Sequence, residues 1–318
     1  MCEMIRPHFH FRKMYTKIKN YCKNCKICIK NKSRSGEKLG LLGQYDPATK
    51  PFEIMSLDTV GGLGGKRSRK KYLHILIDHF TRYVYVSTSK NQTAKEFIKL
   101  IQKVCKDNKI SVLMSDQYGG LGAEELKNFL KSKNILHVYM SVDCASSNGL
   151  NERVGQYIVN RLRCKTNTKR NEKKCWTSLV QGCVQEYNDT IHTSTGFTPN
   201  YLMNGIHPEL VPKILDGKHD FLKDREKAFE DLKKSHERNK LRYNKGRIDV
   251  EFEAGDEVYV SSGNKLNREK LDELRIGPFR VREKLSKTVY KLEEGSKKGE
   301  SLNFHISKMV PKREVIDE

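Results

Sequence analysis

Between about residues 52 and 208, short apolar runs typical of strands alternate with segments whose apolar residues recur at helical spacing. This pattern predicts an α/β fold with a mixed five-stranded sheet flanked by helices. The first three strands are separated only by short turns, so we expect an antiparallel meander, and the later two follow helices and should add in parallel. We expect strands at 54–60, 72–79, 83–88, 110–115 and 135–139, and helices at 93–106, 123–132, 147–163 and 174–191.

The flanking segments have different patterns. Residues 12–28 have apolar positions on one helical face, which predicts an N-terminal helix rich in lysine and cysteine. Residues 221–245 are densely charged and predict a solvated linker helix. From 252 to 312, short alternating stretches separated by Gly-Asp and Gly-Pro predict a small all-β barrel.

The formal net charge of +22 and the pI near 9.5 favour a polyanionic partner, most simply nucleic acid, over a charge that serves solubility alone. The chain has nine cysteines, an odd number, and no secretory signal, which predicts a reducing, intracellular environment. No apolar stretch approaches the length of a membrane span, so no membrane partner is expected.

Three acidic residues are candidates for chemistry. Asp58 and Asp116 end apolar strand runs, and Glu152 lies just inside a predicted helix, with thirty-five residues between the last two. Ligands of α/β proteins gather at the carboxyl ends of parallel strands. Carboxylates that meet there can hold two divalent cations, and paired cations catalyse phosphodiester chemistry. Taken alone, Glu152 is equally well explained as an ordinary exposed glutamate near a helix N-terminus.

The motifs around these acids resemble those of one family, the integrases of retroviruses and of gypsy-type long-terminal-repeat retrotransposons. The Gly277-Pro278-Phe279 segment of the β-rich tail similarly resembles the GPY/F module of gypsy-type elements. The core motifs occur in the family's order, with the family's spacing between the second and third acid. The matching core segments are Ser56–Asp58, Ile77–Tyr83, Ser115–Gly120, Ser147–Arg153 and His192–Pro199.

The resemblance implies an RNase H-like catalytic core in which Asp58, Asp116 and Glu152 hold two Mg²⁺ or Mn²⁺ ions. It further implies an enzyme, a polynucleotidyl transferase that trims the 3′ ends of the element's DNA and joins them to target DNA. It also implies a homo-multimer that acts on two DNA ends. Asp78 lies away from the metals in the family and is interpreted as structural.

The predicted helix that carries Glu152 has a polar stripe opposite its apolar face. Gln156, Asn160 and Arg163 belong to this stripe, and Asn148 precedes the helix in a flexible turn. We predict that these four residues bind DNA, and a merely solvated face is the alternative. The basic run 65–71 is a turn between strands or a nuclear-localisation patch.

Cys25 and Cys28 have the spacing of half a zinc site, within a CxxCxxC run that starts at Cys22. The resembling family completes this site with two upstream histidines. The sequence begins too late to contain them, so Zn²⁺ binding is in doubt, with His8 and His10 as the only nearby substitutes. We expect Met1 to be an internal methionine of a longer polyprotein.

Four domains are expected. They are a partial zinc-binding module at 1–38, the catalytic core at 52–208, a helical linker at 209–246 and an SH3-like barrel at 247–312. Two other functions compete with that of a nuclear DNA integrase. One is a domesticated integrase descendant that binds DNA without cutting it, and the other is a nuclease with the RNase H-like fold.

Overall fold

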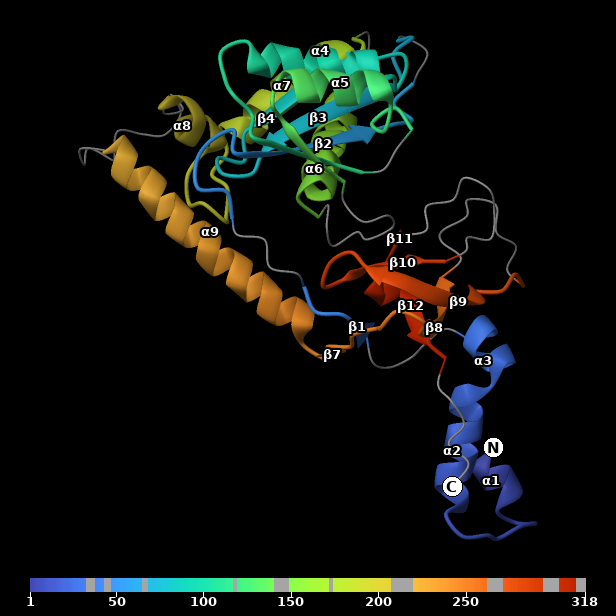
Figure 1. Cartoon of the computed structure of the whole chain (residues 1–318). Coiled ribbons are helices and arrows are strands. Elements are labelled where there is room, and N and C mark those ends of the chain that lie inside the picture. The colour runs from blue at the N-terminus through green and yellow to red at the C-terminus, as the bar shows by residue number, and fades with distance from the viewer. Residues whose placement is uncertain are drawn as a thin grey trace. The chain divides into compact units, whose positions relative to one another are not determined.

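The computed structural model describes residues 1–32, 38–42, 47–64, 68–116, 119–139, 149–171, 174–206, 220–261, 271–293 and 303–312. The described residues form two compact units, one running from 47 to 241 and the other combining 1–42 with 242–312. Each unit has a sheet of its own (Figure 1). No helix among the described residues is both long and apolar enough to span a bilayer.

The larger unit is built on a mixed five-stranded sheet with the order β4-β3-β2-β5-β6. The pairs β2–β3 and β3–β4 are antiparallel, whereas β2–β5 and β5–β6 are parallel. This confirms the predicted meander with two parallel additions. The strands are β2 (Ile54–Val60), β3 (Tyr72–Asp78), β4 (Val84–Ser89), β5 (Val112–Ser115) and β6 (Leu136–Tyr139).

Helices cover both faces of this sheet, with α4 and α5 on one side and α6 on the other (Figure 1). The apolar residues of α4 and α5 pack with Met55 and Leu57 of β2. Those of α6 and α7 pack with Ile75 and Ile77 of β3. The helices of this unit are α4 (Ala94–Cys105), α5 (Glu124–Ser132), α6 (Gly149–Thr166), the short η1 (Lys169–Asn171), α7 (Trp176–Asn188) and α8 (Pro199–Asn204).

Helix α6 lies directly against β2. A Cβ atom at Gly155 would be 3.2 Å from Val60 Cγ2 and 3.7 Å from Ile75 Cδ1, so a larger residue there would crowd the Val60 side chain. Because successive residues of a strand point to opposite faces, the even-numbered positions of β2 face α6 and the odd-numbered ones face α4 and α5.

The charged helix α9 (Phe221–Asn244) is less solvated than predicted. Ala228 and Leu232 are fully buried. The hydroxyl of Tyr201 in α8 donates a hydrogen bond to Asp224 at 2.7 Å, and Arg225 donates to the carbonyl of Leu202. The amino-terminal half of α9 therefore belongs to the packed larger unit, because its few apolar residues fall on one face.

The smaller unit contains a second five-stranded sheet, antiparallel throughout, with the order β11-β10-β9-β8-β12. This confirms the β-rich tail expected from 252 to 312. A short parallel pair, β1 with β7, adds Leu39 to the same core. The elements are β1 (Lys38–Leu39), β7 (Arg247–Ile248), β8 (Glu257–Ser261), β9 (Arg275–Lys284), β10 (Val289–Leu292), β11 (Asn303–His305), η3 (Ile306–Lys308) and β12 (Met309–Pro311).

The predicted single helix over 12–28 is wrong. After α1 (Cys2–Ile5), the chain forms α2 (Met14–Asn24) and α3 (Lys26–Asn31), separated by Cys25 in an extended conformation with ψ 111°. The break allows α3 to pack on β9, where Arg275 donates hydrogen bonds to the carbonyl oxygens of Ile29 and Lys32 at 2.5 and 2.9 Å. A cationic side chain at a helix C-terminus is favourable because the last carbonyl groups lack partners.

Candidate active site

Two of the three candidate acids directly follow a pair of residues that lie opposite each other in neighbouring strands. The parallel pairing of β2 with β5 reaches Leu57 opposite Ser115, so the next position places Asp58 beside Asp116. Adjacent strands are about 4.8 Å apart. Leu57 and Ser115 are fully buried on the α4 side, and the strand pleat therefore directs both carboxylates to the α6 side. Asp58 is partly buried, and Asp116 is exposed.

The third acid, Glu152, is exposed in the first turn of α6, on the same side of the sheet. The residue before it anchors the helix. Asn151 is fully buried, and its Oδ1 accepts a hydrogen bond from the hydroxyl of Ser56 at 2.5 Å. Because that hydroxyl has only one proton, Nε2–H of His79 must donate the 2.9 Å bond to Ser56 Oγ. A buried polar tether thus joins α6 to β2 two residues before Asp58.

The electrostatics also connect Asp58 with Glu152. Burial raises the pKa of Asp58, the neighbouring negative charge of Glu152 raises it further, and a 2.7 Å hydrogen bond from the backbone N–H of Thr59 opposes both. A partly buried carboxylate whose pKa is raised by a second carboxylate is typical of a site that binds cations.

The donors of the three acids are oxygen atoms only, which suits Mg²⁺ or Mn²⁺ rather than softer metals. Within the part of the chain that the structure describes, no three His, Cys, Asp or Glu side chains are gathered closely enough to hold a metal ion. Asp116 and Glu152 are exposed, so rotation of their side chains is unhindered by packing.

Of the residues predicted to bind DNA, Gln156, Asn160 and Arg163 are exposed along one side of α6. Arg163 Nη1 donates a hydrogen bond to Asn160 Oδ1 at 2.9 Å. Asn148 lies outside the described residues. DNA contact by these four side chains remains a prediction.

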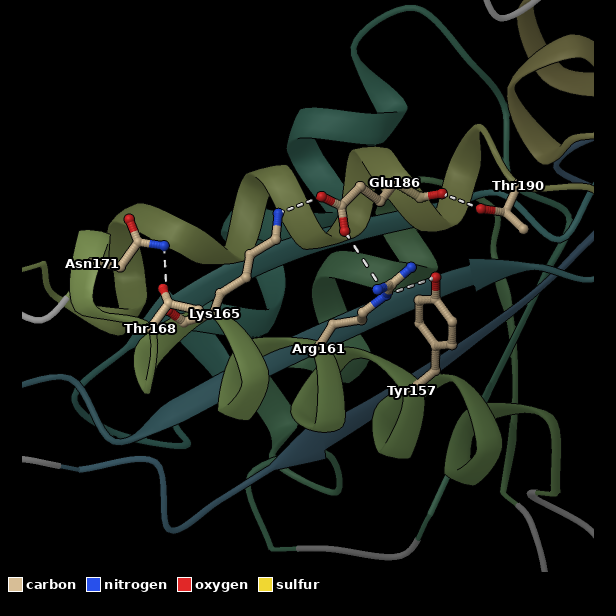
Figure 2. Close-up of polar contacts among 7 residues, drawn as sticks. All are labelled: Tyr157, Arg161, Lys165, Thr168, Asn171, Glu186 and Thr190. Carbon is tan, nitrogen blue, oxygen red and sulfur yellow. Dashed lines mark hydrogen bonds and ion pairs between the residues drawn. The ribbon is translucent and has the colours of Figure 1, made fainter. Parts of the chain in front are cut away.

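A second feature of α6 was not expected from the sequence. Its cations Arg161 and Lys165 both pair with Glu186 of α7, and Arg161 also contacts the hydroxyl of Tyr157 (Figure 2). Together with the Asn151 tether, this cluster fixes α6 on the sheet. The sequence signal for the tether is an asparagine beside Leu150 in the apolar stripe of the helix.

Asp78 has the structural role that was predicted. It is fully buried, and its carboxylate accepts hydrogen bonds from the backbone N–H groups of Phe52 and Thr81 and from the Thr81 hydroxyl, each at 2.7 Å. These bonds close the turn between β3 and β4. Both of its oxygens are therefore engaged in holding this turn.

The cysteines of the N-terminal module form only part of a zinc site. The backbone N–H of Cys28 and then its side chain hold the pKa of the Cys25 thiol below its ordinary value, which places these two residues in contact. Cys22 contacts the sulfur of Met1 at 3.4 Å. Among the described residues no third Cys or His joins Cys25 and Cys28, so the donors present correspond to half of a tetrahedral site.

Comparison with known proteins agrees with this picture. Residues 48–143 match the integrase core domain family, and residues 1–34 match the integrase zinc binding domain family. These two segments are therefore similar to an integrase core domain and to an integrase zinc binding domain. The matched core segment contains the strands β2 to β6 of the mixed sheet.

Over nearly its whole length the chain is also similar to retrotransposon polyproteins, in line with the resemblance of its motifs. The Tf2-3 and Tf2-4 transposon polyproteins of Schizosaccharomyces pombe are each 25% identical to it over 325 residues, covering 96% of this chain. The alignment covers only 24% of each polyprotein. The fold is shared with a chain of the simian T-cell lymphotropic virus intasome in complex with PP2A regulatory subunit B56 gamma. That likeness has a TM-score of 0.62 at 16% identity and covers 99% of this chain and 95% of the viral one.

Proposed function

We propose that this chain is an integrase that trims the 3′ ends of retrotransposon DNA and joins them to target DNA, with Asp58, Asp116 and Glu152 as its catalytic residues. The observation that supports this most directly is the strand register, which pairs Leu57 with Ser115, the residues immediately before Asp58 and Asp116. The raised pKa of Asp58, caused first by burial and also by the charge of Glu152, supports it as well. The integrase core match over 48–143 includes the first two acids.

Asp58 would be shared by two Mg²⁺ or Mn²⁺ ions, with Asp116 and Glu152 each completing one site. Such ions, when bound, stabilise developing negative charge and activate an oxygen nucleophile. The fold itself serves to hold the carboxylates in position. The N–H of Thr59 fixes Asp58, and the buried Asn151 fixes the helix turn that carries Glu152.

The remaining parts of the proposal concern the partners and the flanking domains. DNA would lie along Gln156, Asn160 and Arg163, with Asn148 at the start of the helix. The net charge of +22 supports a DNA partner. We further propose a homo-multimer that works on two DNA ends in the nucleus.

The proposed domain boundaries are 1–38, 52–208, 209–246 and 247–312. The C-terminal antiparallel sheet would form an SH3-like barrel. In the N-terminal module, Cys25 and Cys28 would supply two thiolates to zinc.

A strand-transfer assay tests the catalytic proposal. The full chain is incubated with Mg²⁺, a duplex carrying the element's termini and a target plasmid. Glu152→Gln keeps the size of the side chain and removes its charge, and we expect joining to fall at least a hundredfold. Glu125→Gln is the matched control, because Glu125 is also an exposed glutamate in the first turn of a helix, α5.

Equal joining by wild type and Glu152→Gln would refute the assignment of the active site. DNA binding without joining or cleavage by the wild type would instead indicate a domesticated DNA-binding protein. Cleavage of RNA or junctions without joining would indicate a nuclease with the same fold.

A further inference from the structure

The turn between β3 and β4 holds an arginine, Arg82, with one unsatisfied donor. Arg82 is partly buried, and its Nε atom is out of contact with solvent and has no hydrogen-bond acceptor. Its backbone has a left-handed φ of 67°, and its N–H donates to the carbonyl of Asp78 at 2.9 Å, so the turn fixes where the side chain starts. The Asp78 carboxylate attracts the guanidinium, but its oxygens already accept bonds from Phe52 and Thr81.

A second unsatisfied donor lies next to Arg82. Tyr187, near the end of α7, is only 8% exposed, and its hydroxyl is buried without a hydrogen-bond partner. Its ring packs against those of Tyr157 and His192, with centroids 5.3 and 6.3 Å apart. Arg82 and the Tyr187 hydroxyl interact electrostatically with each other. A buried polar group without a partner is rare in native proteins and is unfavourable.

A second cation completes the cluster. Arg153 is exposed in the first turn of α6, donates from Nε to the carbonyl of Gly149 at 2.9 Å, and interacts electrostatically with Arg82 and Tyr187. The nearby His192 is kept neutral, because burial and then the charge of Arg82 lower its pKa to about 4. The positive charges of the two arginines therefore act on each other near Asp78, whose two oxygens already accept three hydrogen bonds.

We propose that Arg82, Arg153 and the hydroxyl of Tyr187 bind one phosphodiester group of the DNA strand beside the active site. A phosphate presents several acceptor oxygens, so one group can accept hydrogen bonds from both guanidinium forks and from the hydroxyl. Arg153 directly follows Glu152 in the same helical turn. A phosphate held there would fix the strand relative to the carboxylates. The identification of the anion as DNA phosphate rests on the proposed function. The existence of an anion site rests only on the unpaired donors.

The first experiment uses inorganic phosphate as the probe and thermal melting of the full chain as the readout, with chloride at equal ionic strength as the reference. Phosphate should raise the melting temperature of the wild type. Tyr187→Phe removes only the unpaired hydroxyl. It should therefore melt higher than the wild type without phosphate and bind phosphate about tenfold more weakly. A lower melting temperature without phosphate would show that the hydroxyl is already paired and would overturn the proposal.

The second experiment measures duplex DNA binding by fluorescence anisotropy in EDTA, so that no joining takes place. Tyr187→Phe and Arg82→Lys, which keeps the charge but loses the planar fork, should each weaken binding about tenfold. Arg153→Gln should reduce the slope of log affinity against log salt by about 0.9, as expected for one lost phosphate contact. Arg161→Gln is the control. It removes a positive charge from the same helix, but this charge already pairs with Glu186.

Unchanged DNA affinity in Tyr187→Phe and Arg82→Lys would overturn the phosphate site, whatever the joining assay shows. Conversely, weakened binding in these variants together with equal joining by wild type and Glu152→Gln would leave the phosphate site standing and refute only the catalytic assignment.

Discussion

The tether between Ser56 and Asn151 should matter for catalysis as well as for stability. Asn151→Ala removes the buried oxygen that accepts the hydrogen bond of the Ser56 hydroxyl. Ser56→Ala leaves both the Asn151 oxygen and the His79 N–H without this partner. A net hydrogen bond contributes roughly 1 kcal/mol, and a stranded buried partner costs about 1–3 kcal/mol. Each single variant should therefore lose about 2 kcal/mol of unfolding free energy.

The double variant separates the tether from two independent defects. If the two side chains act through one bond, Ser56→Ala combined with Asn151→Ala should be more stable than additivity predicts by about 1 kcal/mol. Urea unfolding measures this coupling. Joining at saturating DNA, well below the melting temperature, should fall about a hundredfold in each single variant because Glu152 is misplaced, and little further in the double variant.

Ser89→Ala is the matched control for this cycle. Ser89 is 3% exposed in the same sheet, and its hydroxyl contacts His74 Nε2 at 2.7 Å on the α4 side of the sheet. We expect a comparable loss of stability with joining retained. Additive stability losses, or joining defects that multiply in the double variant, would show that Ser56 and Asn151 do not position Glu152 together.

Three further predictions concern packing, the N-terminal module and pH. Gly120→Ala should destabilise the chain by roughly 1–3 kcal/mol, because the new Cβ would lie 2.4 Å from a backbone carbonyl oxygen. Gly119→Ala should be tolerated, because a Cβ there meets nothing within 4 Å. Urea unfolding of both variants tests this contrast. Arg275→Ala should speed amide exchange in α3 without lowering the melting temperature of the larger unit, since its guanidinium caps that helix. Burial lowers the pKa of His74 to about 4 and that of His79 to about 3, so the unfolded state binds more protons below about pH 6.5. Unfolding free energy should therefore fall by about 2 kcal/mol per histidine between pH 7 and pH 5, opposed by the raised pKa of buried carboxyl groups; equal stability at both pH values would contradict this.

The sheet was predictable because its signals are local. Alternating apolar residues mark each strand, and the short Phe80–Arg82 turn forces β3 and β4 to be antiparallel. The break of the N-terminal helix at Cys25 was not predictable in this way. The helical pattern continues through that residue, and the bonds that hold α3 come from Arg275, 243 to 246 positions further along the chain.

The candidate site was predictable only in part, for a similar reason. Asp58 and Asp116 could be paired from the rule that ligands gather at the carboxyl ends of parallel strands. The tether between Ser56 and Asn151 was not predictable, because only the three-dimensional structure shows that Ser56 faces the first turn of α6. The same holds for Arg82 and Tyr187, whose unpaired donors become visible only when the turn and α7 are placed together.

The two anchors of α6 suggest how a metal site would close. The buried Asn151 bond holds the first turn of the helix, and the Glu186 cluster holds its middle (Figure 2). Since the backbone is already fixed, Mg²⁺ should recruit the exposed Asp116 and Glu152 by side-chain rotation rather than by moving the helix. We therefore expect Mg²⁺ to raise the melting temperature while amide exchange along residues 151–166 stays unchanged. A large gain in amide protection there would show instead that the cation orders the helix.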